Sequence, residues 1–216
     1  MRLIATTCGT HYHIETFEGD RAPLVWDVVV PPERLAEVLH PEDTLFVPCR
    51  SPAQRLIAVA ETIRAHLDGG GAVVAMGESR SDLWLPHVAF TPRPTNWWWW
   101  LEPGAELGVE VTAPDHPLLA DLEPRDVIWH LHGHFDPPAG SEVLVRDAEG
   151  RALLYVDTVS TNGRMVVTSL DPCFHHGSHF MPATTRFLAG FLPALGALVK
   201  QERSWTRSPS ARTART

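Results

Sequence analysis

The sequence lacks the features that mark secreted or membrane-embedded proteins. It has only three cysteines, Cys8, Cys49 and Cys173, at wide spacing and without a Cys-x-x-Cys pair. This usage is typical of reduced thiols and excludes a disulfide framework. The apolar runs fall short of the roughly 20 residues of a membrane helix, and the first ten residues are too weakly apolar for a signal peptide. We therefore expect a cytoplasmic protein with no membrane partner.

Positive charge is also scarce. The chain has 18 Lys and Arg against 26 Asp and Glu, a formal net charge of -8. Because nucleic-acid binding usually requires a basic face, the composition favours a small-molecule ligand and excludes nucleic acid as an expected partner. The one basic stretch is residues 201–216, where Ser, Thr, Pro and Arg show no apolar period. We expect a disordered basic tail there, after a single domain over residues 1–200.

Strand and helix patterns alternate in the first half of the chain. Short apolar strand patterns lie at residues 2–6, 24–30, 44–48 and 72–76, and amphipathic helix patterns lie at 31–39 and 52–71. Strands separated by helices predict right-handed crossovers and a parallel sheet buried on both faces. The fold class expected is therefore α/β, with a mostly parallel sheet flanked by helices.

The second half of the sequence changes character. Prolines and four consecutive tryptophans predict a long loop over residues 86–106. Short β patterns at 107–111, 127–133, 141–147 and 151–159 then predict an antiparallel extension of the sheet. A buried-strand pattern at 163–170 and a helix over 181–200 complete the chain, and there is no internal repeat.

Polar segments follow four of the expected parallel strands. They are "TTCGTHYH" from Thr6, "PCRS" from Pro48, "GESRSD" from Gly77 and "DPCFHHGSHF" from Asp171. Open parallel sheets bind ligands outside the carboxyl ends of their strands, so these segments predict a site at one edge. Cys8, Arg50 and Asp171 are candidate ligand-binding residues in these segments.

The order of these pieces resembles a known superfamily. "HLDGGGAVVAMGES", "DHPLLADL" and "NGRMVVTSLDPCFHHG" are similar to segments of the class I glutamine amidotransferase-like proteins, within them the trehalose-utilisation (ThuA-like) branch. The resemblance covers roughly residues 1–200 and implies a flavodoxin-like domain. An active glutaminase of this family has a cysteine at the strand-to-helix elbow and a later His-x-Glu. Here Ser79 takes the cysteine's place, and Asp171 and Cys173 take the places of the histidine and the glutamate, so the standard triad is absent.

One hypothesis for the chemistry is hydrolysis. Ser79 at the elbow is a candidate nucleophile, with His175 or His176 as its base from a shifted position. Glu78, at the end of a buried strand, is a candidate acid or base. The alternative is that Glu78 caps a helix or pairs with an arginine.

A second hypothesis is a metal site. The chain has 12 histidines, grouped at residues 11–13, 130–134 and 175–179. His-x-His in a strand puts both imidazoles on one face, a sound spacing for a divalent ion such as zinc, with His132, His134 and His176 as candidate ligands. No His-Glu-x-x-His motif marks a metal, and helix capping or core histidines bonded to the backbone are alternatives.

The tryptophan run offers a third interpretation. Trp97 and Trp98 can line a cavity and stack on a flat ring such as a sugar, with Asn96 bonding a hydroxyl. They can alternatively staple the loop over the sheet or form a homodimer contact. A hydrolase-type enzyme, a metal-dependent enzyme and a non-catalytic ligand-binding or assembly module therefore all stay open.

Overall fold

A single ten-stranded sheet organises the computed structural model, which describes residues 2–24, 26–95 and 97–206. Five neighbouring strands are parallel: β2 (Val28–Val30), β1 (Leu3–Thr6), β3 (Thr44–Val47), β4 (Ala72–Ala75) and β10 (Arg164–Thr168). This is the strand order of flavodoxin-like sheets, with β10 as the fifth parallel strand. The antiparallel strands continue from β10: β9 (Ala152–Asp157), β7 (Gly133–Phe135) and β5 (Phe90–Pro92). Strand β8 (Glu142–Arg146) also pairs with β9, and β6 (Glu110–Val111) pairs with β8. The predicted α/β sheet with an antiparallel extension is confirmed.

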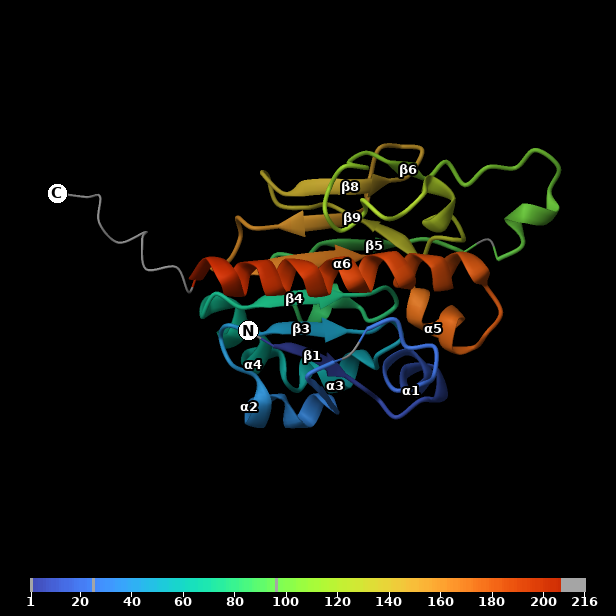
Figure 1. Ribbon diagram of the computed structural model, residues 1–216. Coiled ribbons are helices and arrows are strands. Elements are labelled where there is room, and N and C mark those ends of the chain that lie inside the picture. The colour runs from blue at the N-terminus through green and yellow to red at the C-terminus, as the bar shows by residue number, and fades with distance from the viewer. Residues whose placement is uncertain (1, 25, 96, 207–216) are drawn as a thin grey trace.

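Helices cover the sheet. The α-helices are α1 (His11–Phe17), α2 (Leu35–Val38), α3 (Ala53–Ile57), α4 (Ala60–Asp68), α5 (Pro172–Gly177) and α6 (Pro182–Thr206), with short 3-10 turns at Pro32–Arg34, Ser81–Leu83, Trp99–Leu101 and Pro124–Asp126. Figure 1 shows α6 running across the sheet, and α1 and α5 at the end toward which the arrows of β1 and β3 point. That end is where the predicted polar segments lie.

Alternate residues of each parallel strand enter two separate core layers. Leu3 and Ala5 of β1 pack in the layer that contains α6, whereas Ile4 packs in the layer that contains α2, α3 and α4. Both faces of the strands are therefore apolar, which explains why their sequences read as continuous apolar runs rather than alternating ones.

Helix α6 contributes most of its apolar face to this core. Phe187, Leu188 and Phe191 are fully buried, as their helical spacing predicts. The segment Pro182–Val199 has the length and mean hydropathy (1.2) of a membrane span, but here its apolar side packs on the sheet. The absence of a membrane partner stays a prediction. The helix extends to Thr206, beyond the expected start of the tail, and residues 207–216 lie outside the described residues.

Three expectations differ from the structure. The long loop expected over residues 86–106 contains strand β5, because Phe90–Pro92 pairs with β7. The helix expected over residues 52–71 is divided into α3 and α4 by a break at Ala58 and Val59. The strand expected over 127–133 is irregular until Gly133, where β7 begins, so His130 and His132 lie in a loop. Residues 127–132 have a composition that favours a strand. They do not form one because the neighbouring strand, β5, pairs only with the residues from Gly133 onward.

Candidate functional site

The segments after β4 and β10 approach each other closely at the carboxyl edge of the sheet. The backbone N–H of Gly77 donates to the carbonyl oxygen of Leu170 (2.8 Å), and a Cβ at Gly77 would lie 2.3 Å from the Ser169 carbonyl oxygen. Only glycine permits this approach. It brings Glu78, which follows β4, next to Asp171, which follows β10.

Asp171 lies at the centre of a buried group of histidines. The Nε2 atom of His130 lies 3.1 Å from Asp171 Oδ1, and the Nε2 atoms of His132 and His175 lie 3.2 and 3.3 Å from Asp171 Oδ2. The Nε2 atoms of His130 and His175 are 3.1 Å apart. Asp171 occupies the N-cap position of α5 and His175 lies four residues later in that helix, so both side chains lie on the same face of α5. We call these four residues the Asp171 cluster.

Burial and charge both act on this cluster. Burial alone raises the pKa of the Asp171 carboxyl, but the contacts with His130, His132 and His175 outweigh it and hold that pKa well below its usual range. Burial lowers the pKa of His130, against the opposing effect of Asp171. An ionised carboxylate therefore faces an imidazole that is neutral near pH 7, and neutral imidazole is the form that binds metals.

Hydrogen bonds fix the tautomer of His132. Thr95 Oγ1 donates to the Leu131 carbonyl oxygen (3.1 Å) and therefore accepts from His132 Nδ1, 3.2 Å away. Glu78 Oε1 lies 3.3 Å from the same Nδ1. Because Nδ1 donates to these partners, Nε2 is the ring nitrogen that faces Asp171 Oδ2, 3.2 Å away. Neither of these two buried atoms has a hydrogen-bond partner among the described residues.

Arg50 and Glu78 are held in the left-handed region of backbone space, with φ of 59° and 56°. Residues other than glycine are uncommon there, and such strain clusters at functional sites. Arg50 Nε pairs with Glu78 Oε2 at 2.7 Å, and its Nη2 lies 3.6 Å from Asp171 Oδ2. The guanidinium also lies over the ring of Phe174, 3.5 Å from its centroid. Arg50 is therefore the cation that joins the ends of β3, β4 and β10.

A cavity of about 670 Å³ adjoins the Asp171 cluster. His175 and Arg50 are its charged or titratable lining side chains. The other lining residues are apolar or aromatic: Trp97, Trp98, Trp99, Ile128, Trp129, Phe174, Phe180, Met181 and Pro182. The Trp97 ring lies 4.4 Å from the His130 ring, centroid to centroid, so this indole separates part of the cavity from the cluster. The predicted role of Trp97 and Trp98 as cavity-lining residues matches their position.

The predicted serine nucleophile is not placed for catalysis. Ser79 is buried, and its hydroxyl donates to the Met76 carbonyl oxygen at 2.7 Å, which satisfies it within the turn after β4. Glu78, rather than Ser79, occupies the strained position. A serine whose proton is held by a carbonyl, with no hydrogen bond to an imidazole among the described residues, lacks the geometry of an activated nucleophile.

The three cysteines are free thiols, and the surroundings of Cys8 and Cys49 keep these two protonated. Burial raises the pKa of Cys8, and it raises the pKa of the fully buried Cys49 well above its usual range. Near Cys8, His13 Nδ1 accepts from the Cys8 backbone N–H, and His13 Nε2 donates to the Cys49 carbonyl oxygen. For His13 the structure therefore supports the alternative of a core histidine that is hydrogen-bonded to the backbone.

Two of the three predicted metal ligands lie outside the Asp171 cluster. His176 points toward α6, where its Nδ1 lies 3.1 Å from Thr185 Oγ1, because consecutive helical residues point about 100° apart. His134 lies on β7, past Gly133, and joins none of the described groups that can hold a metal. Of the three predicted ligands, His132 is the one that lies in the Asp171 cluster. Asn96 lies outside the described residues.

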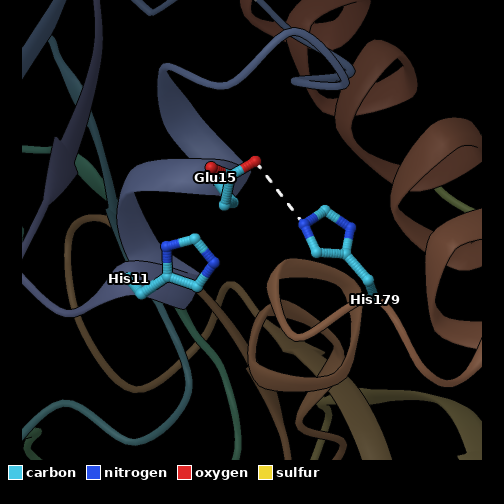
Figure 2. Close-up of side chains that lie close together, drawn as sticks. All are labelled: His11, Glu15 and His179. Atoms are coloured by element: carbon cyan, nitrogen blue, oxygen red, sulfur yellow. Dashed lines mark ion pairs between the residues drawn. The ribbon is translucent and has the colours of Figure 1, made fainter.

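Another histidine group lies on the surface. His11 and Glu15, four residues apart on α1, approach His179, and we call these three the Glu15 cluster. Figure 2 shows the Glu15 carboxylate directed toward His179, with Oε2 and Nε2 3.7 Å apart. Arg21 Nη1 lies 2.7 Å from His179 Nδ1. Since arginine only donates, Nδ1 accepts and Nε2 carries the proton, so the nitrogen that faces Glu15 has no lone pair for a metal.

Several site residues were missed by the sequence-based prediction. His130 has the same His-x-His relation to His132 as His134 has, so the spacing could have included it. Thr95, Trp129, Phe174 and Phe180 carry no motif, and only the three-dimensional arrangement identifies them.

No protein-family model matches the chain, and no curated protein matches it. Among solved structures, the GH42 β-galactosidase Gan42B aligns with a TM-score of 0.48 and 12% identity, over 92% of this chain and 30% of that one. A β-galactosidase from the Antarctic haloarchaeon Halorubrum lacusprofundi aligns with a TM-score of 0.42 and 15% identity, over 85% of this chain and 30% of that one. The exo-β-1,4-mannosidase Op5Man5 from Opitutaceae bacterium strain TAV5 aligns with a TM-score of 0.43 and 10% identity, over 96% of this chain and 36% of that one.

The chain thus spans about a third of the length of these glycosidases. At such low identity and TM-score, we infer nothing about activity from this likeness. The resemblance to the ThuA-like branch stays a prediction.

Proposed function

We propose that this chain is a metal-dependent enzyme whose Asp171 cluster binds one divalent transition metal, with zinc as the first candidate. His130, His175 and Asp171 would be the ligands, and the adjoining cavity would receive a small molecule. The observation that carries this proposal is the convergence of His130 Nε2, His175 Nε2 and the Asp171 carboxylate in a buried place. The carboxylate, whose Oδ2 has no hydrogen-bond partner among the described residues, is the charge that a cation would balance.

The spacing of the ligand atoms supports the same conclusion. Zinc binds imidazole nitrogen and carboxylate oxygen at about 2.0–2.2 Å in tetrahedral geometry, which puts neighbouring ligand atoms roughly 3.3 Å apart. The separations His130 Nε2 to His175 Nε2 and His130 Nε2 to Asp171 Oδ1 are both 3.1 Å. The ligand atoms therefore already stand near the distances that a bound ion requires.

Glu78 and Thr95 would support the site from outside the ligands. Metal sites commonly hold a histidine by hydrogen bonds to its other ring nitrogen. His132 Nδ1 has both of these partners, at 3.3 Å and 3.2 Å. They would orient its Nε2 toward Asp171 Oδ2 and so hold that ligand in place.

Hydrolysis is the reaction class that these residues favour. A zinc ion with three protein ligands keeps a position for water or substrate, lowers the pKa of that water to about 7 and polarises carbonyl groups. Arg50 would hold Glu78 in place, and Trp97 would limit the access of bulk water. This route needs no serine nucleophile, in agreement with the position of Ser79.

A second candidate is a non-catalytic ligand-binding module. The aromatic cavity favours it equally, since a binding protein needs the cavity and not the metal. Metal content and catalytic turnover distinguish the two candidate functions. The homodimer contact stays a prediction under either of them.

Elemental analysis of untagged protein tests the metal. We expect about one equivalent of zinc, lost in His130→Asn and His175→Asn and retained in the matched variant His134→Asn, with folding checked by circular dichroism. Zinc that persists in His130→Asn and His175→Asn but disappears in His11→Asn would assign it to the Glu15 cluster and contradict the proposal. Metal-free protein that does not take up zinc on dialysis would contradict it too.

A further inference from the structure

The cavity beside His175 has the wrong polarity for a sugar. Every hydroxyl of a buried sugar needs a hydrogen-bond partner, because a buried polar group without one costs free energy. The Trp99 indole N–H already donates to the Trp129 carbonyl oxygen, and the Trp129 indole N–H donates to Asp171 Oδ1 at 3.2 Å. These two indoles thus offer ring surface rather than donors.

The aromatic lining fits a flat apolar group. Phe174 and Phe180 lie edge to face, with centroids 6.2 Å apart, and Phe180 and His175 likewise at 4.8 Å. Aromatic rings pack favourably in stacked and edge-to-face arrangements at these distances. Together with the tryptophans among the lining residues, these rings offer faces and edges to a planar ligand.

One end of the cavity has the charge to hold an anionic oxygen. Among the described residues, Arg50 is the arginine or lysine that pairs with Glu78 and Asp171, so two carboxylates share one guanidinium beside the histidines. A divalent ion in the Asp171 cluster would add two positive charges here. Arg50 Nη2 and His175 Nε2 both lie near Asp171 Oδ2, at 3.6 and 3.3 Å, so an anionic oxygen of the ligand at this point would approach the ion and Arg50 together.

We propose that the cavity is the subsite for a planar apolar ring that bears one carboxylate or carboxylate-derived group. The ring lies among the tryptophans and Phe180, and the oxygen atoms reach the metal end at His175 and Arg50. The part that concerns the oxygen atoms rests on the proposed metal function; the part that concerns the ring does not. The substrate class is then an ester or amide of an aromatic acid, and the aromatic carboxylate is its product.

Isothermal titration calorimetry with three probes tests this inference. The probes are 2-naphthoate (ring and carboxylate), indole (ring alone) and trehalose (sugar), added to the full chain loaded with zinc. We expect 2-naphthoate to bind most tightly, indole more weakly and trehalose not at all. Phe180→Ala should weaken both ring probes about tenfold, whereas Leu101→Ala, also exposed and close in sequence to the tryptophans but absent from the cavity lining, should leave them unchanged.

A chelator separates the two parts of the inference. Removing zinc should weaken 2-naphthoate at least tenfold and leave indole unchanged. Equal binding of 2-naphthoate with and without zinc, still dependent on Phe180, would support the ring subsite and overturn the role of the metal. Binding of trehalose in preference to both ring probes, or ring binding that Phe180→Ala does not change, would overturn the inference.

Discussion

The Asp171 cluster and the Glu15 cluster both combine histidines with a carboxylate, but their surroundings differ. In the Asp171 cluster all four side chains are buried, and Thr95 and Glu78 hold His132 Nδ1 so that Nε2 faces Asp171. In the Glu15 cluster the histidines are exposed, and Arg21 fixes the opposite tautomer at His179. Residue types alone therefore do not define a metal site. The partners of the distal ring nitrogens decide which of the two clusters presents lone pairs.

The largest expected effect follows from removing the central carboxylate. Asp171→Asn should weaken zinc binding on the order of 100-fold or more, because it removes the charge that all three imidazoles share. Glu15→Gln, the matched change in the other cluster, should leave zinc affinity unchanged. Competition with a chromophoric chelator measures both. Equal losses in the two variants would break the distinction between the clusters.

Metal removal should also affect stability. A ligand that binds only the folded state stabilises it by about 4 kcal/mol when present at 1,000 times its Kd. We expect a chelator to lower the unfolding temperature of the unmodified chain, and to have no effect on Asp171→Asn. Differential scanning fluorimetry measures this. An equal shift in Asp171→Asn would place the stabilising ion elsewhere.

A smaller effect is expected from the threonine behind His132. Thr95→Val removes one of the two acceptors for His132 Nδ1, the other being Glu78, and should weaken zinc binding 10- to 100-fold, as losses of such supporting partners typically do. Thr185→Val is the control, since its hydroxyl contacts His176 Nδ1 at a similar distance, 3.1 Å, outside the cluster. Zinc affinity that does not change in Thr95→Val would show that the tautomer of His132 is not what prepares the site.

Buried and exposed histidines should also differ in their effect on acid stability. Burial lowers the pKa of His66, whose Nε2 donates to the Ala72 carbonyl oxygen. Because the unfolded chain takes up this proton first, stability is full above the unfolded pKa of about 6.5 and is lost as pH falls below it, by at most about 1.4 kcal/mol per pH unit. Urea unfolding of metal-free protein at about pH 7.5 and 5.5 should show this loss, reduced in His66→Gln and unchanged in His179→Gln. A His66→Gln profile that matches the unmodified chain would contradict it.

The smallest effect is expected at Arg21. Arg21→Gln removes an exposed contact with His179 and should shift the unfolding temperature by less than about 2 °C. It also frees His179 Nδ1, so the Glu15 cluster should gain weak zinc binding that is absent in the unmodified chain. A calorimetric titration of Arg21→Gln combined with Asp171→Asn detects that gain in isolation. No gain would mean that exposure, rather than Arg21, keeps metal from this cluster.

Local patterns predicted the parallel half of the fold well. The apolar runs at β1, β3, β4 and β10 are strands buried on both faces, as predicted, and Phe187, Leu188 and Phe191 lie on the core side of a helix, as their period predicts. The same reasoning failed at residues 127–133, because a β-rich segment becomes a strand only where a neighbour offers backbone partners. The break between α3 and α4 likewise has no signal as strong as a proline or glycine.

The sequence by itself determined that polar segments follow the parallel strands, and so that Arg50, Glu78, Asp171 and His175 would meet at one edge. It could not determine which histidines join them. His175 and His176 are adjacent in the chain, but their side chains point to different neighbours. His130 contacts Asp171 although the two residues are 41 positions apart in the sequence (130 and 171). Only the tertiary structure decided this, because direction and burial depend on packing between distant segments. The partner of each ring nitrogen, which distinguishes a ligand from a core histidine, exists only once those segments have met.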